Sequence, residues 1–263
     1  MSRIAVVTGG SSGIGRCTAQ ALADAGCKVW ELSRRDSEVS GISHISADVT
    51  DPVQVENAVK RILDEDGRID ILINNAGFGI SGAAEFTENA DAKKLLDVNI
   101  FGMVNMSKAV IPVMREQGKG KIVNLSSVAA VAPIPFQAWY TVSKAAVNGY
   151  TMALANEVKP FGITVCAVMP GDIKTGFTAA REKSAAGDDI YCGRIERSVK
   201  QMEHDEETGM DPSVAGKFIC HLAMKKRVKP LNAIGAVYKL FTVLAKILPA
   251  SLVNFILYQM YAK

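Results

Sequence analysis

The sequence lacks an excess of charge of either sign. It has 30 Lys and Arg against 27 Asp and Glu, a formal net charge of +3. Proteins that bind nucleic acids usually gather positive charge on one face, so this balance argues against a nucleic-acid partner. Histidine is scarce, and His44, His204 and His221 share no pattern with one another or with carboxylates. We therefore expect structural or surface roles for the histidines, and no metal site.

Cysteine is poorly arranged for either of its usual structural uses. The five cysteines are an odd number and form no CxxC pair. A disulfide framework and a zinc site are therefore both unexpected, and reduced thiols in a cytosolic protein are the better interpretation. A secretory leader is also not expected, because the first apolar run already begins at Ile4 and resembles a strand. These features predict a cytoplasmic protein.

Long apolar runs are missing except near the end of the chain. Residues 234–261 are mostly apolar but are interrupted by Lys239, Lys246 and Pro249, which argues against a membrane-spanning helix. Pro249 is expected to separate two short helices, the first with apolar residues at steps of three and four. Those residues are Val237, Leu240, Phe241, Leu244 and Leu248.

Four uses of this tail stay open. It could be a lid over an apolar pocket, a subunit interface, an in-plane membrane anchor or helices packed on the body. We favour a lid or an interface, with peripheral membrane contact as a possible association. Each of the three functional uses points to a hydrophobic substrate.

Short β-rich runs alternate with helical segments over most of the chain. We expect strands near residues 3–8, 28–33, 43–49, 69–77, 121–127 and 163–171. We expect helices near residues 16–26, 51–67, 91–117 and 140–158. This alternation predicts an α/β fold, a single Rossmann-like domain over residues 1–263, with helices on both faces of a doubly wound parallel sheet. Residues 231–263 would form a C-terminal helical extension.

The pattern breaks between Phe177 and Gly209. This segment is polar and weakly periodic, with little to bury. We interpret it as a mobile insertion beside the carboxyl ends of the strands, the edge at which α/β sheets bind ligands.

The stretch AVVTGGSSGIGR, residues 5–16, places four glycines immediately after an apolar run. Glycine in an ordered element costs backbone entropy, so a specific need for bare backbone is implied. A strand followed by a glycine-rich turn and a helix lets pyrophosphate approach the free N–H groups of the helix N-terminus. The spacing, TGxxxGxG rather than GxGxxG, predicts a dinucleotide-binding loop.

Further motifs follow this loop in order. They are Asp48–Val49, NNAG at Asn74–Gly77, Asn99, Ser127, YTVSK at Tyr140–Lys144 and PGDIKT at Pro170–Thr175. Together the motifs resemble those of the short-chain dehydrogenase/reductase family over about residues 3–225. Within that family the chain is most similar to the 17β-hydroxysteroid-dehydrogenase-like reductases, on looser features such as NNAGFGI and the apolar tail.

The resemblance implies a catalytic tetrad of Asn99, Ser127, Tyr140 and Lys144, with Ser127 preferred over Ser126 on its interval to the tyrosine. In the family the lysine also binds the cofactor ribose, and the helix of the asparagine positions water in a proton relay. The implied cofactor-binding residues are Thr8, Gly9, Ser11, Ser12, Gly13, Ile14, Gly15, Ser33, Arg34, Arg35, Asp48, Val49, Asn75, Ala76, Gly77, Tyr140, Lys144, Pro170, Gly171, Ile173 and Thr175.

The chemistry of carbonyl reduction suits these residues. It needs a hydride donor, a proton donor and a hydrogen bond to the developing alkoxide. Lys144 lies one helical turn after Tyr140, and its charge is expected to lower the pKa of the tyrosine toward a range useful for acid–base catalysis. Ser127 would hold the substrate oxygen.

The cofactor is expected to be NADP(H). Sites that prefer NAD usually carry an acidic residue at the end of the second strand, where Ser33 stands here, followed by Arg34 and Arg35. A guanidinium suits the 2′-phosphate of NADP(H). The acidic residues Glu31 and Asp36 lie nearby, and an acidic residue in this region would instead favour NAD(H).

The sequence therefore predicts an NADP(H)-dependent oxidoreductase that interconverts a ketone and a secondary alcohol on a steroid or lipid-like molecule. One alternative is a 1-acyl-dihydroxyacetone-phosphate reductase, for which Lys174, Arg181 and Lys183 would supply an ambiguous phosphate site. Another is a non-catalytic NADP(H)-binding scaffold. The family commonly forms dimers or tetramers through its two long helices, so a homo-oligomer is expected.

Overall fold

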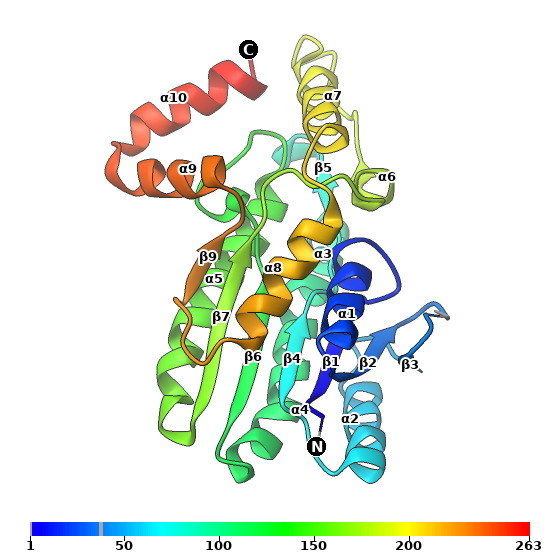
Figure 1. Cartoon of the computed structure of the whole chain (residues 1–263). Helices are drawn as coiled ribbons and strands as arrows, with labels where there is room; N and C mark the ends of the chain where they lie inside the picture. The colour runs from blue at the N-terminus through cyan, green and yellow to red at the C-terminus, as the bar shows by residue number, and fades with distance from the viewer. Residues whose placement is uncertain (1, 37–38) are drawn as a thin grey trace.

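A seven-stranded parallel sheet forms the centre of the computed structural model, which describes residues 2–36 and 39–263 (Figure 1). Its strand order, β3-β2-β1-β4-β6-β7-β9, reverses direction at β1, as in a doubly wound sheet. The predicted fold class is confirmed. The strands are β1 Ile4–Thr8, β2 Lys28–Ser33, β3 Ile42–Ser46, β4 Ile71–Asn74, β6 Gly120–Leu125, β7 Ile163–Met169 and β9 Leu231–Ala233.

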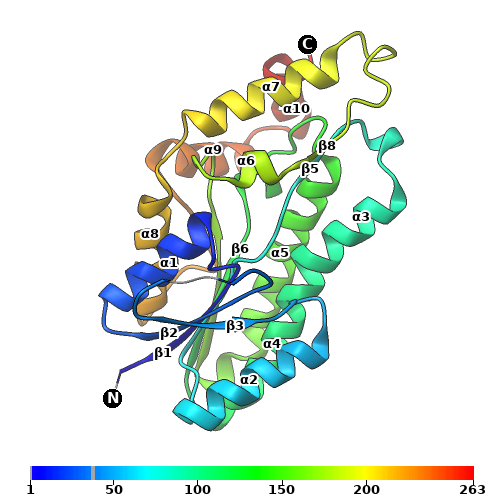
Figure 2. The ribbon, with the colours of Figure 1, turned by 90° about the vertical axis from the view of Figure 1, so that its right-hand side faces the viewer.

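Helices cover both faces of this sheet (Figure 2). One hydrophobic core lies between the sheet and α1 Gly13–Asp24 and α8 Pro212–Met224. The other lies between the sheet and α2 Pro52–Asp66, α4 Met103–Glu116 and α5 Ala138–Glu157. Because both faces are covered, the central strands are mostly apolar, and every residue of β1 is buried. Three 3-10 turns, η1 Ala84–Phe86, η3 Val128–Ala130 and η4 Lys159–Phe161, complete the connections.

The helix ends follow the local sequence. Asp51 caps α2 by accepting hydrogen bonds from the amides of Val53 and Gln54, with Pro52 in the first turn as predicted. The helical stretch predicted over 91–117 is present as α3 Asn89–Leu96, a π-helical turn η2 Asp97–Gly102, and α4.

The segment 177–209 is more ordered in its secondary structure than predicted. It contains α6 Phe177–Ala180, β8 Glu182–Lys183, which pairs with β5 Ile80–Ser81, and α7 Arg194–Glu207. Ile195, Val199 and Met202 of α7 are buried. The expectation that this segment has little to bury is therefore wrong. The reason is that its few apolar residues fall at helical spacing on one face.

The tail forms two helices, α9 Ala236–Ile247 and α10 Ala250–Tyr261, separated at Pro249 as predicted. They lie over the carboxyl-terminal edge of the sheet, near α7 (Figure 1). Much of the predicted apolar stripe faces outward, since Val237, Leu240 and Leu244 are exposed. Within residues 2–36 and 39–263, no helix is both long and apolar enough to cross a bilayer.

Candidate active site

A cavity of about 1240 Å³ opens at the carboxyl ends of the strands. Residues from the turns after β1, β2, β4, β6 and β7 line it, and residues of α7, α9 and α10 close it from above. Nearly all the predicted site residues lie in its wall. These are Gly9, Ser11, Ser12, Gly13, Ile14, Gly15, Ser33, Arg34, Arg35, Asp48, Val49, Asn75, Ala76, Gly77, Ser127, Tyr140, Lys144, Pro170, Gly171, Ile173 and Thr175.

Thr8 and Asn99, the other two predicted residues, are buried behind this wall. The Thr8 hydroxyl accepts hydrogen bonds from the amides of Asn75 and Ala76, both at 3.0 Å. The Asn75 side chain in turn donates to the Thr8 and Gly9 carbonyls. Thr8 therefore positions the two cofactor loops relative to each other.

The glycines of the turn after β1 are needed because a side chain at these positions would collide with the backbone or force it into a strained conformation. A Cβ on Gly15 would lie 2.3 Å from the Gly9 carbonyl oxygen, and Gly9 and Gly13 adopt positive φ values of 65° and 52°. The turn leads into the N-terminus of α1, where the N-cap side chain of Ser12 makes no hydrogen bond to the first N–H groups of the helix. This cradle fits a dinucleotide: the turn would hold its pyrophosphate, and Asp48 and Val49 would flank its adenine.

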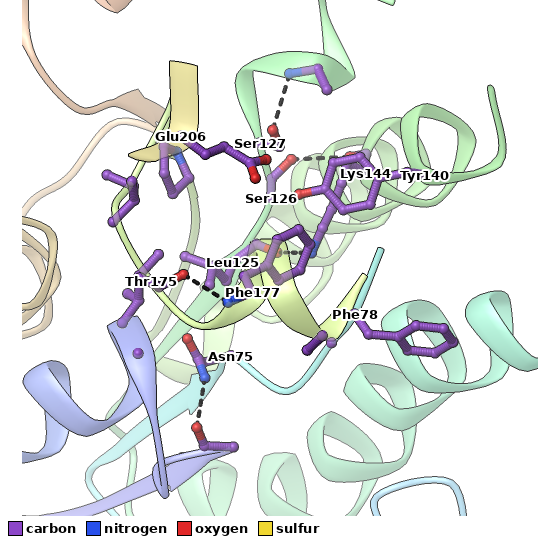
Figure 3. A pocket seen from close by; sticks show the side chains of 18 of the residues that line it. Asn75, Phe78, Leu125, Ser126, Ser127, Tyr140, Lys144, Thr175, Phe177 and Glu206 are labelled. Carbon is purple, nitrogen blue, oxygen red and sulfur yellow. Dashed lines mark hydrogen bonds between the residues drawn. The ribbon is translucent and has the colours of Figure 1, made fainter. Parts of the chain in front are cut away.

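Ser127, Tyr140 and Lys144 meet in the same part of the cavity (Figure 3). The hydroxyl of Ser127 accepts a hydrogen bond from the amide of Ala129 at 3.1 Å and also acts on the side chain of Tyr140, whose pKa it lowers. Ser126 instead donates its hydroxyl to the Lys144 carbonyl at 3.0 Å. Ser127 and Tyr140 thus line the same part of the cavity, whereas the hydroxyl of Ser126 is engaged by the backbone of α5.

Burial controls the protonation of the tyrosine and the lysine. It raises the pKa of Tyr140 to about 12, and the Ser127 hydrogen bond opposes this effect. Burial also lowers the pKa of Lys144 to about 8. The Lys144 ammonium donates to the Leu125 carbonyl at 2.9 Å and lies 5.7 Å from the centre of the Tyr140 ring. The net shift of the Tyr140 pKa is therefore upward and not downward as expected, because desolvation of the phenol outweighs nearby charges.

Asn99 sits in the π-helical turn η2, an element that often marks functional sites. Its side chain amide pairs with the backbone of Phe78, accepting from the N–H and donating to the carbonyl, both at 3.0 Å. It also lies 3.0 Å from the Ser143 hydroxyl. Asn99 thus fixes the chain after β4, where a Cβ on Gly77 would lie 2.8 Å from Asn99 Oδ1.

The adenine end of the cavity is lined by Ser33, Arg34 and Arg35. Arg34 is largely exposed and lies 3.9 Å from the Asp48 carboxylate. The competing acid, Glu31, is buried, and one of its oxygens lies 2.7 Å from His44 Nδ1 and 2.8 Å from the Ser33 hydroxyl. Glu31 therefore has partners inside the protein, whereas the arginines face the cavity.

A group of four residues that no sequence motif predicts lies at the other end of the cavity. The Tyr238 hydroxyl donates to Asp172 at 2.6 Å, and the Tyr261 hydroxyl donates to Asp205 at 3.0 Å. All four line the cavity. Burial raises the pKa of Asp172, and burial together with the Asp172 carboxylate raises that of Tyr238 to about 12. No short-range spacing predicts these pairs, since their members are 66 and 56 residues apart.

The comparisons with known proteins agree with this geometry. The family model described as short chain dehydrogenase matches residues 3–186. A 3-ketodihydrosphingosine reductase of Bacteroides thetaiotaomicron is 41% identical over 99% of this chain and 98% of its own length. The crystal structure of a short-chain dehydrogenase from Streptomyces avermitilis superposes with a TM-score of 0.86 at 29% identity, covering 98% of this chain and 97% of that one.

Two further solved structures contain cofactor. A 3-ketoacyl-(acyl-carrier-protein) reductase from Brucella melitensis is complexed with NADH, with a TM-score of 0.75 at 25% identity over 88% of this chain and 96% of its own. The structure of ElxO has NADP bound, with a TM-score of 0.76 at 28% identity over 91% of this chain and 99% of its own. The relatives thus use nicotinamide cofactors of both kinds. On its matched motifs, fold and full-length relatives, this chain is an oxidoreductase of the short-chain dehydrogenase/reductase family.

Proposed function

We propose that this protein reduces the ketone of a long-chain amino ketone such as 3-ketodihydrosphingosine, with NADPH as the hydride donor. The observation that carries the proposal is the continuity of the cavity. It runs from Tyr140 to an apolar wall formed by the tail, including Phe241, Leu257 and Met260. A wall of this kind suits an alkyl chain, because each buried CH₂ contributes about 0.8 kcal/mol.

The charges near Tyr140 favour an amino lipid over a phosphorylated one. Asp172 and Asp205 line the cavity and would repel a phosphate, whereas an ammonium group would be attracted. Two cations considered for a phosphate site, Arg181 and Lys183, are already paired with Glu206 and Glu203. This arrangement weighs against the 1-acyl-dihydroxyacetone-phosphate alternative.

The preference for NADPH rests on Arg34 and Arg35 in the cavity wall and on the burial of Glu31. A guanidinium binds the 2′-phosphate through charge-assisted hydrogen bonds, which a ribose hydroxyl cannot offer to the same degree.

Each residue of the proposed site would have its own role in the reduction. Bound NADPH would supply the hydride. Ser127 donates a hydrogen bond to the substrate carbonyl oxygen, and Tyr140 transfers its phenolic proton to that oxygen as charge develops. A pKa of about 12 keeps Tyr140 protonated, and so able to act as an acid, at neutral pH. Lys144 would hold the cofactor ribose and stabilise the phenolate left behind.

The test is NADPH consumption with a panel of ketones: 3-ketodihydrosphingosine, 1-acyl-dihydroxyacetone phosphate and a 17-ketosteroid. We expect the highest kcat/KM with the amino ketone. Tyr140→Phe should lower kcat by about 10²–10⁴ while leaving the Kd for NADPH nearly unchanged. A higher kcat/KM with the acyl phosphate ketone or the steroid would contradict the substrate assignment, and no turnover of any ketone despite NADPH binding would favour the scaffold alternative.

A further inference from the structure

The two tail helices present a large apolar surface on the side away from the cavity. On α9 it includes Leu240, Val243 and Ile247, and on α10 it includes Leu252, Phe255 and Ile256. We call these six residues the tail face. Ile247 is 73% exposed, Leu240 61% and Phe255 58%. Soluble monomers rarely expose so many large apolar side chains on neighbouring helices. Such a surface usually marks a binding site for another protein or a membrane.

We propose that the tail face docks on the surface of a lipid bilayer that carries anionic headgroups. The first support is the charge around it. Residues 236–263 contain three lysines and no Asp or Glu, although the whole chain is nearly balanced. Lys239 and Lys246 are seven residues apart, so on α9 they lie together at one border between the tail face and the inner side. Lysines at this border suit a helix lying in the headgroup region.

The dimensions of the helices support docking in the plane of the membrane. Each has twelve residues and is therefore about 18 Å long, well short of the roughly 30 Å of a bilayer core. An apolar face flanked by lysines on helices of this length is typical of interfacial binding. A second copy of the chain is the competing occupant, and the oligomeric state distinguishes it from a bilayer.

Docking of the tail face on a bilayer would bring the cavity close to a membrane-resident substrate. This step rests on the proposed function. Val237 and Met260 are 75% and 55% exposed and also line the cavity, so its rim is continuous with the tail face. A long-chain ketone resides in membranes rather than in water. With the tail face on a bilayer, such a substrate could reach Tyr140 through this rim without crossing the aqueous phase.

The experiment is flotation of the full chain with phosphatidylcholine vesicles, with and without phosphatidylglycerol. We expect flotation with the anionic vesicles. The double variant Leu240→Glu, Phe255→Glu should lower the partition coefficient between vesicles and buffer by about tenfold or more. Neither residue lines the cavity, and binding of NADPH should be unchanged. Val53→Glu on α2, where Val53 is 63% exposed, is the matched control and should float like the natural chain.

Absence of flotation, or equal flotation of the double variant and the control, would overturn the proposal. So would loss of an oligomer in the double variant, by sedimentation velocity, without any vesicle binding by the natural chain; that result would assign the face to a second copy. Equal binding to neutral and anionic vesicles would contradict the proposed contribution of the lysines to binding. Flotation as expected without turnover of the amino ketone would leave docking intact and contradict the proposed substrate instead.

Discussion

At the scale of single residues, Lys144 is the most informative. A buried ammonium with a pKa of about 8 disfavours the folded state wherever it is charged there. Between pH 8 and the ordinary value of 10.5, the folded protein releases this proton while the unfolded chain keeps it. Because the unfolded state then binds more protons, stability rises with pH across this window.

We therefore predict that the free energy of unfolding of the cofactor-free protein, compared with that of Lys144→Met, rises by about 2 kcal/mol from pH 8 to pH 10. Urea unfolding of both proteins at several pH values measures the difference, so that other titrating groups cancel. Tyr140 disturbs this comparison little, since its raised pKa matters only above pH 10. A difference that stays constant with pH would show that Lys144 is fully charged throughout.

Arg34 carries the second prediction at this scale. Arg34→Ala should raise the Kd for NADPH by about tenfold and barely change that for NADH. We choose the lower end of the range for a charge-assisted contact, because 73% of the side chain is exposed and solvent screens it. Fluorescence titration with both cofactors provides the measurement. Natural protein that binds NADH as tightly as NADPH would rule out Arg34 as a phosphate ligand.

The site residues that the sequence could identify are those in local motifs. Ser127, Tyr140 and Lys144 could be chosen because their intervals along the chain are characteristic. Asp172 could not be paired with Tyr238, since only the folded chain brings them together. The direction of the pKa shift at Tyr140 was also beyond sequence reasoning, because it depends on how completely the phenol is buried.

At the scale of elements, the tail helices invite a truncation. β9 ends at Ala233, so a chain ending at Gly235 keeps the whole sheet and removes only α9 and α10. We expect the ratio of kcat/KM for a long-chain ketone to that for a short-chain ketone to fall about tenfold or more, since the wall against the alkyl chain is lost. Using the ratio cancels any change in cofactor affinity. An unchanged ratio would mean that these helices do not contact the substrate.

Two elements show what limits prediction at this scale. α7 could have been anticipated, because Ile195, Val199 and Met202 follow helical spacing within an otherwise polar segment. β9 could not, since its sequence LNA has no strand pattern. It joins the sheet only through its pairing with β7.

At the scale of the whole molecule, the predicted homo-oligomer concerns a different surface from the tail face. Val142 and Met152 on α5, one of the two long helices, are 47% and 46% exposed. If the family's usual interface is used, Met152→Asp should raise the dissociation constant of the oligomer about tenfold or more, because it would bury an unpaired charge. Sedimentation velocity over a range of concentrations tests this. An unaltered oligomer would place the interface elsewhere, and a monomeric natural chain would contradict the expectation itself.

The packing of Tyr238 on Gly171 has a consequence for how strongly the two ligands affect each other's binding. A Cβ on Gly171 would lie 2.1 Å from the Tyr238 ring, so α9 rests directly on the loop after β7 in the cavity wall. Any shift of this loop on cofactor binding would then move the wall of the proposed lipid site. Reciprocity requires that lipid binding alter NADPH affinity by the same factor as NADPH alters lipid affinity. The enzyme would thus behave as a heterotropic pair of sites, in which each ligand changes the affinity for the other by the same factor.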